Sequence, residues 1–499
     1  MKLMDNYLNK LKSVIKPEKI GYQIENIGRV VEIKDGVIIF EGLETVGYGE
    51  LVSFENGIKA MVIDIEEERV GAIVLGDYLK IREGDLASTD RIQASIAVSS
   101  DLIGRVINPV GDPLDGMGPV EAKKRYPLEK IAPGVIYRSP VSVPLQTGNK
   151  AIDALIPIGR GQRELIIGDQ VTGKTTIAID TIINQKDEDV ICIYCAIGQK
   201  ESKVASVVEL LKQREAFNYT IVVNASAADP VALQYLAPYA SCAIAEYFMD
   251  QGRDVLIVYD DLTKHAWAYR QLSLVLRRPA GREAYPGDIF YLHSRLLERA
   301  CCLSKKYGGG SITALPIIET LEGDVSAYIP TNIISITDGQ IFLEKDLFNA
   351  GVRPAINIGI SVSRVGGKAQ VKAMKQVAGK LKLDLAQYRE MAAFSQFESD
   401  LDESTKKFLN RGAKISQILR QNKHELFSLA TQVSIIWAAT QGYLDDLDLK
   451  KVPLFEEKFV EELEISHKEL LKKISSQKEI TPQNEKQLAE IVKKILATL

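Results

Sequence analysis

Cysteine and histidine, which most often build metal and redox sites, are scarce in this sequence. Its five cysteines are an odd number, which does not suit a closed set of disulfides, and its four histidines are scattered along the chain. Cys192 and Cys195 form a CxxC pair inside the run VICIYCAIG, but no second pair completes a tetrahedral zinc site. Of the two interpretations, a redox or zinc pair and two small apolar residues on a buried strand, we therefore favour the second.

Excess charge and long apolar segments are also missing. Lys plus Arg number 62 against 66 Asp plus Glu, so the formal net charge is -4 and no global field would gather nucleic acid. The first residues, MKLMDNYLNKLKSVIK, lack the apolar core of a signal peptide, and no run of about eighteen apolar residues follows. We expect a cytosolic chain, or one that lies peripherally on a membrane.

At 499 residues the chain is too long for one hydrophobic core and is expected to be multidomain. After an N-terminal segment, 1–23, short apolar runs over 24–88 alternate with turn residues, which predicts an N-terminal antiparallel β-barrel. Over 89–370, β-branched runs alternate with helical stretches, which predicts a central α/β domain with a mostly parallel sheet. Helical periodicity over 371–499 predicts a C-terminal α-helical domain.

The most informative stretch is GDQVTGKT at 168–175, which fits the phosphate-loop pattern of a glycine, four residues, then Gly, Lys and Ser or Thr. A strand leads into it and a helix follows, so backbone amides and the helix N-terminus would face phosphate oxygens. Lys174 would reach the β- and γ-phosphates, and Thr175 would offer its hydroxyl to Mg²⁺. The expected nucleotide contacts are Gly168, Asp169, Gln170, Val171, Thr172, Gly173, Lys174, Thr175 and Thr176.

A second element has to hold the metal from the far side of the phosphates. VLIVYDD at 255–261 supplies an acid at the end of a hydrophobic strand. We expect Asp260 to hold Mg²⁺ through a water, and Asp261 to cap the helix that follows. The buried strands expected in this domain span 164–169, 190–198, 220–226 and 254–261.

Hydrolysis needs, in addition, a group that activates the attacking water. This group commonly follows the strand beside the loop strand, and here we expect that strand to end in AIGQK, which offers Gln199. Glu201 lies two residues further on, where a change of direction or the start of a helix would aim it elsewhere. Because an amide cannot accept a proton from water, the site is predicted to hold a nucleotide rather than hydrolyse it.

Together these residues resemble the α subunits of the F-type ATP synthase family, over nearly the whole chain. The segments that carry the resemblance include GDQVTGKT, AIGQK, LIVYDDLTKHAWAYRQLSLVLRRPAGREAYPGD, FYLHSRLLERA and AAFSQFESDLDESTKKFLNRG. The most specific is PAINIGISVSR at 354–364, which is similar to the signature of the α/β ATPases and ends in the α-type arginine. The resemblance implies a RecA-like P-loop core, a crown made by the barrel, and a ring of three α and three β subunits around the γ central stalk.

The resemblance also implies roles for single residues. Arg364 would be an arginine finger on the γ-phosphate held by a neighbouring β subunit, with Ser361 in the same loop; such fingers are worth roughly 10³ to 10⁵ in rate. A guanidinium suits this role because it is permanently charged and forks onto phosphate oxygens. Arg353, Pro354 and Gln421 would surround adenine. Taken singly, each residue also has a simpler interpretation. Arg364 could be a surface residue, Arg353-Pro354 a turn, and Gln421 a solvated helix position.

Some positions depart from the family's pattern. Gln170 and Val171 stand where α subunits usually carry Arg-Gln, which removes a charge near the phosphates. Lys423 stands where a second adenine-facing glutamine is usual. The N-terminal segment, which in the family docks to the δ-type subunit of the peripheral stalk, is shorter than usual.

Three other functions share parts of this pattern. A self-sufficient catalytic ATPase, such as a β subunit or a secretion ATPase, would need Glu at 199. An RNA translocase of the Rho type would need a basic and aromatic N-terminal fold, whereas 24–86 holds more acids than bases. A scaffold with a vestigial loop would not need an intact GKT motif and Asp260.

We therefore predict a regulatory, non-catalytic subunit that binds ATP or ADP with Mg²⁺ and no nucleic acid. It would support ATP synthesis from ADP and phosphate, driven by a transmembrane ion gradient through a membrane ion-translocating sector. Its expected location is the cytoplasmic face of a bacterial inner membrane, or the matrix or stromal face of an organelle membrane.

Overall fold

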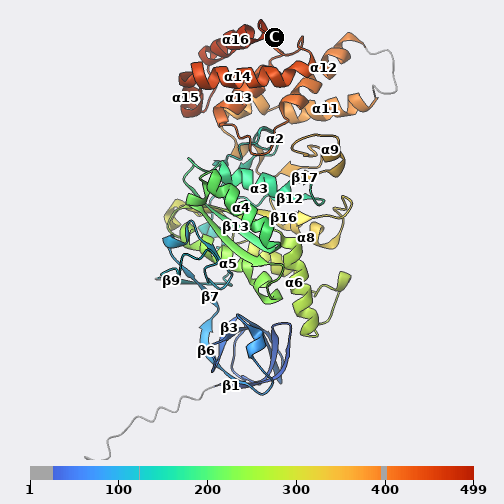
Figure 1. Ribbon diagram of the computed structural model, residues 1–499. Coiled ribbons are helices and arrows are strands. Elements are labelled where there is room, and N and C mark those ends of the chain that lie inside the picture. Colours follow the sequence, from blue (N-terminus) through green and yellow to red (C-terminus); the bar gives the residue numbers. More distant parts are fainter. Residues whose placement is uncertain (1–25, 123, 395–401) are drawn as a thin grey trace, which may run out of the picture. The chain divides into compact units, whose positions relative to one another are not determined.

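The computed structural model describes residues 26–122, 124–394 and 402–499 (Figure 1). The chain divides into two compact units, Met1–Gln93 and Ala94–Leu499, and each is described by itself. The segment 1–23, with its expected docking to a δ-type subunit, lies outside the described residues. No helix within the described residues is both long and apolar enough to cross a bilayer.

A closed six-stranded barrel forms the first unit, which confirms the predicted antiparallel barrel. Its strand order is β1-β2-β5-β4-β3-β6, and β1 pairs with β6 so that the barrel closes without a free edge. Alternate side chains, such as those of Val30, Ile38 and Phe40, fill its interior. The strands are β1 Ile27–Lys34, β2 Val37–Gly42, β3 Glu50–Phe54, β4 Lys59–Ile65, β5 Arg69–Val74 and β6 Leu86–Gln93.

An eight-stranded sheet organises the second unit, in the order β18-β17-β12-β16-β15-β13-β14-β8. All neighbours are parallel except β17 and β18, as the continuous β-branched runs predicted. The strands are β8 Val106–Ile107, β12 Leu165–Gly168, β13 Val190–Gln199, β14 Thr220–Ser226, β15 Asp254–Asp260, β16 Ser311–Glu319, β17 Gly339–Leu343 and β18 Val362–Ser363. Two small sheets accompany it, formed by β7 Ser95–Val98 with β9 Lys124–Pro127 and by β10 Pro144–Leu145 with β11 Ile158–Gly159.

The strand order corrects one expectation. The strand that ends in AIGQK, β13, was expected beside the loop strand β12, but β15 and β16 lie between them. The crossover connections insert these two later strands into the middle of the sheet, and local sequence does not encode that order. Because β13 pairs with β15, its end still lies next to Asp260.

Helices pack against this sheet on both sides of the central strands, among them α3 to α6 (Figure 1). The helices of this part are α2 Lys150–Leu155, α3 Lys174–Ile183, α4 Glu201–Gln213, α5 Val231–Met249, α6 Leu262–Val275, α7 Ile289–Leu297, α8 Tyr328–Ile336 and α9 Lys345–Asn349.

The remainder of the second unit is helical, as predicted. Figure 1 shows these helices, orange to red, packed on one another, and α13 is buried along most of its length. One apolar core continues from the sheet and its helices into this bundle, since Ile182, Val433 and Phe455 belong to the same cluster. The helices are α10 Lys372–Ala378, α11 Leu381–Phe394, α12 Glu403–Ile418, α13 Leu429–Thr440, α14 Val452–Ser466, α15 Lys468–Gln477 and α16 Pro482–Leu496.

Candidate nucleotide site

The phosphate loop connects β12 to α3, as the motif predicted. Gly173 has φ 102° at the start of α3, in the left-handed region that favours glycine. At Gly168 a side chain would collide with the carbonyl oxygen of Leu343 on the adjacent strand β17. The two glycines of the motif are therefore required by the backbone path, which leaves the N-terminus of α3 open to an anion.

Lys174 lies inside the loop, with 8% of its surface exposed. Its Nζ donates to the carbonyl oxygens of Gly168 at 2.7 Å and Asp169 at 2.5 Å. Burial lowers the pKa of the Lys174 ammonium. The carboxylate of Asp169 accepts hydrogen bonds from Thr320 Oγ1 at 2.6 Å and from the backbone of Gly323 at 2.8 Å, so this side chain supports the loop from behind.

The tip of the loop holds Gln170 and Val171, two of the three residues that depart from the family's pattern. Gln170 Nε2 donates to Glu319 at the end of β16. Val171 is 82% exposed and has φ 65°, a left-handed conformation that costs an L-residue roughly 1–2 kcal/mol. Neither side chain places a positive charge beside the phosphate cradle.

Asp260, at the end of β15, is the centre of a polar cluster and is only 2% exposed. Its Oδ2 accepts hydrogen bonds from Thr175 Oγ1 at 2.9 Å and from Tyr194 OH at 2.7 Å. Lys203 Nζ lies 3.2 Å from the same oxygen and 3.1 Å from Thr175 Oγ1. The sequence predicted that Thr175 and Asp260 serve one Mg²⁺, with a water between Asp260 and the ion; their direct hydrogen bond and the approach of Lys203, in the first turn of α4, were not predicted.

The Gln199 amide lies directly against Asp260. Its Nε2 donates to the Asp260 backbone carbonyl and to Oδ1, each at 3.0 Å, while its Oε1 accepts from Lys203 at 3.0 Å. Glu201 turns away from the cluster and accepts from Asn224 on β14. Asp261 caps α6 by accepting from the backbone of Lys264 at 2.9 Å, as expected, and burial raises the pKa of its carboxyl.

A cavity of about 680 Å³ opens beside the loop and gathers residues that are far apart in the sequence. It brings the predicted adenine contacts Arg353, Pro354 and Gln421 together with Thr172, Gly173 and Thr176 of the loop. A volume of this size is within the range of nucleotide-sized ligand sites. Sequence reasoning missed several residues of its lining, which are Asn149, Ile177, Asp180, Phe348, Ala355 and Asn422.

The Gln421 amide is bonded to the protein through both its oxygen and its nitrogen. Its Oε1 accepts from the Lys150 backbone at 3.0 Å, and its Nε2 donates to the carbonyl oxygens of Gly148 and Glu425. Arg353 stacks its guanidinium 3.6 Å above the Phe348 ring and donates to the Phe348 carbonyl at 2.6 Å. Both residues therefore shape the cavity, and Gln421 joins the helical bundle to the segment that precedes α2.

Arg364 lies at the other end of the sheet from the phosphate loop. Ser363 pairs with Gly339, at the amino end of β17, whereas Gly168 pairs with Leu343 at the carboxyl end. The four residues of β12 separate these ends by roughly 13 Å. The Arg364 side chain is exposed, and its backbone donates to the Asp338 carbonyl at 2.8 Å.

Ser361 is fully buried in the loop that precedes Arg364. Its hydroxyl donates to the Asn357 carbonyl at 2.6 Å and accepts from the Phe342 backbone at 2.9 Å. Its own carbonyl accepts from Lys382 Nζ at 2.8 Å. The geometry suits Ser361 to fixing the loop rather than to contacting a ligand.

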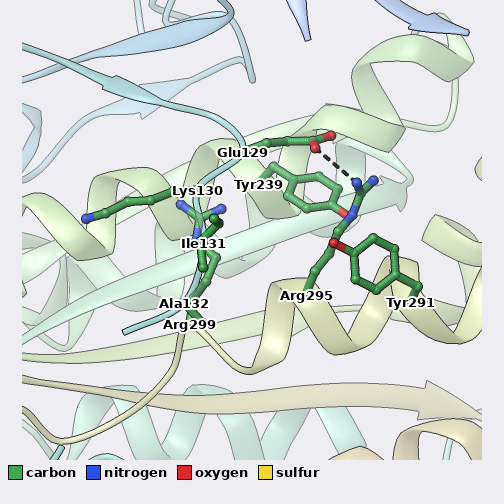
Figure 2. Close-up of a pocket in the computed structure, with 8 residues that line it drawn as sticks. All are labelled: Glu129, Lys130, Ile131, Ala132, Tyr239, Tyr291, Arg295 and Arg299. Atoms are coloured by element: carbon green, nitrogen blue, oxygen red, sulfur yellow. Dashed lines mark hydrogen bonds and ion pairs between the residues drawn. The ribbon is translucent and has the colours of Figure 1, made fainter. Parts of the chain in front are cut away.

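A second cavity, of about 340 Å³, lies between α5, α7 and the segment 129–132 (Figure 2). Each of the three cations in its lining is paired with a carboxylate of the chain. Arg295 contacts Glu129 at 3.0 Å, Arg299 contacts Glu246 at 2.9 Å, and Lys130 lies 3.7 Å from Glu246. These charges therefore stabilise the packing of the segment on α7.

The cysteines lie away from the nucleotide cavity. Cys192 and Cys195 are fully buried on β13, and burial raises the pKa of both thiols. Within the described parts of the chain, no group of three or more His, Cys, Asp or Glu side chains is arranged to hold a metal ion.

The fold and the site together define a P-loop nucleotide-binding protein with a barrel before its core and a helical domain after it. Models of the ATP synthase alpha/beta family match all three parts: the beta-barrel domain at 23–88, the nucleotide-binding domain at 148–363 and the C-terminal domain at 370–495. Proteins described as ATP synthase subunit alpha, from three strains of Dehalococcoides mccartyi, are each 57% identical to this chain. The first two alignments cover 480 residues, 96% of this chain and 95% of the relative, and the third covers 95% of each. The chain therefore belongs to the ATP synthase alpha/beta family, among its alpha subunits.

Proposed function

We propose that this alpha subunit binds Mg²⁺ with ATP or ADP without hydrolysing it, and lends Arg364 to a nucleotide held by a neighbouring β subunit. The observation that carries the proposal is the position of Arg364 at the amino end of the sheet, roughly 13 Å of strand from the phosphate loop of its own chain. A guanidinium exposed there serves a phosphate only if another protein brings the phosphate to it. Alternation with β subunits in an α₃β₃ ring satisfies that requirement.

Gln199 supports the non-catalytic part of the proposal. A general base must accept a proton from the attacking water, and the side chain beside Asp260 is an amide that donates its own hydrogens to that acid. Arg364, the cation that would stabilise transition-state charge, is absent from this end of the sheet. Nucleotide at this site is therefore held rather than turned over.

The residues present fit Mg²⁺. This ion takes one or two protein oxygens and fills its remaining positions with phosphate oxygens and water. Thr175 Oγ1 and Asp260 Oδ2, 2.9 Å apart, offer such a pair, and the Lys203 ammonium beside them marks the place as favourable for positive charge. The bound ion would neutralise phosphate charge, and Lys174 would complete the cradle from the other side.

Membership of the family supports a role for this subunit in ATP synthesis by a complex. The ring would surround a γ stalk and connect through a peripheral stalk with a δ-type subunit to a membrane sector that moves ions. The complex would act as a translocase, with this subunit peripheral on the cytoplasmic face of a bacterial inner membrane.

The proposal is tested by purifying the chain alone and in a mixture with β and γ subunits, and measuring ATP hydrolysis and MgADP binding by each. We expect the chain alone to bind MgADP with turnover below about 1% of the mixture, since a single finger is worth roughly 10³ to 10⁵ in rate. Brisk hydrolysis by the isolated chain would overturn the proposal, and so would a failure to bind nucleotide.

A further inference from the structure

Glu164 is a buried carboxyl group with no role in the site described above. It lies immediately before β12, and its side chain is fully buried. The carboxyl packs against the backbone where β17 meets β18, because a side chain at Gly339 would collide with both Glu164 oxygens and with the carbonyl oxygen of Val362. Glu164 thus supports the paired strands that end at Arg364.

A short chain of hydrogen bonds leads from this carboxyl to the residue before Arg364. Gln162 Nε2 donates to Glu164 Oε2 at 2.7 Å and to Ser363 Oγ at 3.2 Å. Ser363 Oγ in turn donates to the Pro157 carbonyl at 2.7 Å and accepts from the Gly366 backbone at 3.1 Å. The hydroxyl therefore holds both sides of the turn that carries Arg364, and Glu164 orients the amide that bridges to it.

The charge state of Glu164 bears on the same turn. Burial raises the pKa of this carboxyl well above its usual range, and the negative charge of Asp338 raises it further, whereas the Gln162 hydrogen bond, Lys382 and Arg364 lower it. The balance favours the neutral acid. An ionised carboxylate here would attract the Arg364 guanidinium inward, while a neutral acid leaves it exposed at the surface.

We propose that Glu164 is a positioning residue for Arg364: its buried carboxyl, acting through Gln162 and Ser363, holds the β17–β18 turn so that the guanidinium faces outward. The inference rests on the proposed function, since it matters only if Arg364 acts on a neighbour's nucleotide. Glu164 would thus act at the amino end of the phosphate-loop strand, away from the phosphate loop itself.

The test uses the complex with β and γ subunits and the variants Glu164→Ala and Glu164→Gln, each alone and with Arg364→Lys. We expect Glu164→Ala to lower kcat roughly tenfold to a hundredfold, because a misplacement of about 1 Å costs on the order of 10²-fold. KM and the MgADP affinity of this subunit's own site should stay within twofold. Glu164→Gln keeps an acceptor for Gln162 and should retain kcat within about threefold.

The double variants decide whether the effect passes through Arg364. With Arg364→Lys present, Glu164→Ala should lower kcat by less than twofold more. The inference would be overturned if Glu164→Ala lowered kcat by the same factor with and without Arg364→Lys. It would also be overturned if Glu164→Ala left kcat unchanged, or if Glu164→Gln lowered kcat as much as Glu164→Ala does. If Glu164→Ala does not assemble, Gln162→Met removes the bridging amide at similar volume and is expected to show the same pattern. Full turnover in Arg364→Ala would instead overturn the proposed function.

Discussion

The charged side chains at the two ends of strand β12 differ in their burial and in their hydrogen bonds. At the carboxyl end, Lys174, Thr175 and Asp260 are buried or half-buried, bonded to one another or to the loop, and adjoin a cavity of nucleotide size. At the amino end, Arg364 is exposed beyond a turn that Ser363 and Asp338 fix in place. The charges at the carboxyl end thus lie inside the chain, whereas Arg364 is fixed through its backbone and its guanidinium, 3.5 Å from the Ile334 carbonyl, remains exposed, as the proposed role on a neighbouring subunit requires.

The strongest test of this contrast is Arg364→Ala in the complex with β and γ subunits. We expect kcat for ATP hydrolysis to fall on the order of 10³-fold, because the cation that stabilises the transition state is lost. MgADP binding to this subunit should stay within twofold, since the side chain lies at the other end of the strand. Steady-state kinetics and equilibrium binding on the same preparation check both. Turnover that survives within tenfold would contradict the assignment.

Lys174→Ala should give the opposite pattern. Loss of a charged donor in the cradle removes roughly 1.5–3 kcal/mol, so the affinity of this subunit for MgADP should fall about 10²-fold. Turnover of the complex should fall less than tenfold. Isothermal titration of the isolated chain measures the affinity, with the exposed Lys200→Ala as a matched control. If the complex loses activity as completely as with Arg364→Ala, the two ends of the strand are not independent.

Asp260→Asn tests the proposed Mg²⁺ site at the carboxyl end of the strand alone. The amide keeps the shape of the side chain but loses the charge that faces Thr175 and Lys203, so the gain in ADP affinity on adding Mg²⁺ should shrink about tenfold, equivalent to about 1.4 kcal/mol. Affinity measured in EDTA should change little, and this comparison is the internal control. An unchanged response to Mg²⁺ would show that Asp260 does not hold the ion.

Gln199→Glu has the smallest expected effect on turnover. It tests directly whether a carboxylate at this position makes the subunit's own site catalytic. A carboxylate here would lie against Asp260, and Lys203 is the cation that would offset it. We expect hydrolysis by the isolated chain to remain at background and kcat of the complex to change less than about twofold, since Arg364 lies at the far end of the sheet. ATPase activity acquired by the isolated variant would show that the amide alone keeps the site inactive.

Much of this architecture could be predicted from local sequence. The four buried strands and the phosphate loop were predictable because β-branched runs and a fixed motif report short-range structure. The order of strands was not, because β15 and β16 reach their places through long crossovers, and β16 and β17 escaped notice although their apolar runs are of the same kind.

The candidate site shows the same division. Thr175 and Asp260 meet because both belong to motifs tied to strand ends, which sequence reveals. The partners of Gln421 could not be predicted, since Gly148 and Lys150 are more than 250 residues away along the chain and only packing joins them. Burial of the Ser361 hydroxyl could not be predicted either, because the sequence around a loop residue does not indicate which way its side chain points.

Through one amide group, Gln421 bonds the loop that it shares with Glu425 to the backbone at Gly148 and Lys150. A tilt of the C-terminal helices relative to the core would have to stretch or break these bonds and at the same time change the width of the cavity that Gln421 lines. Filling of this cavity and the tilt of the C-terminal helices are therefore coupled. A ligand bound in the cavity would therefore restrict the motion of C-terminal helices that do not contact it.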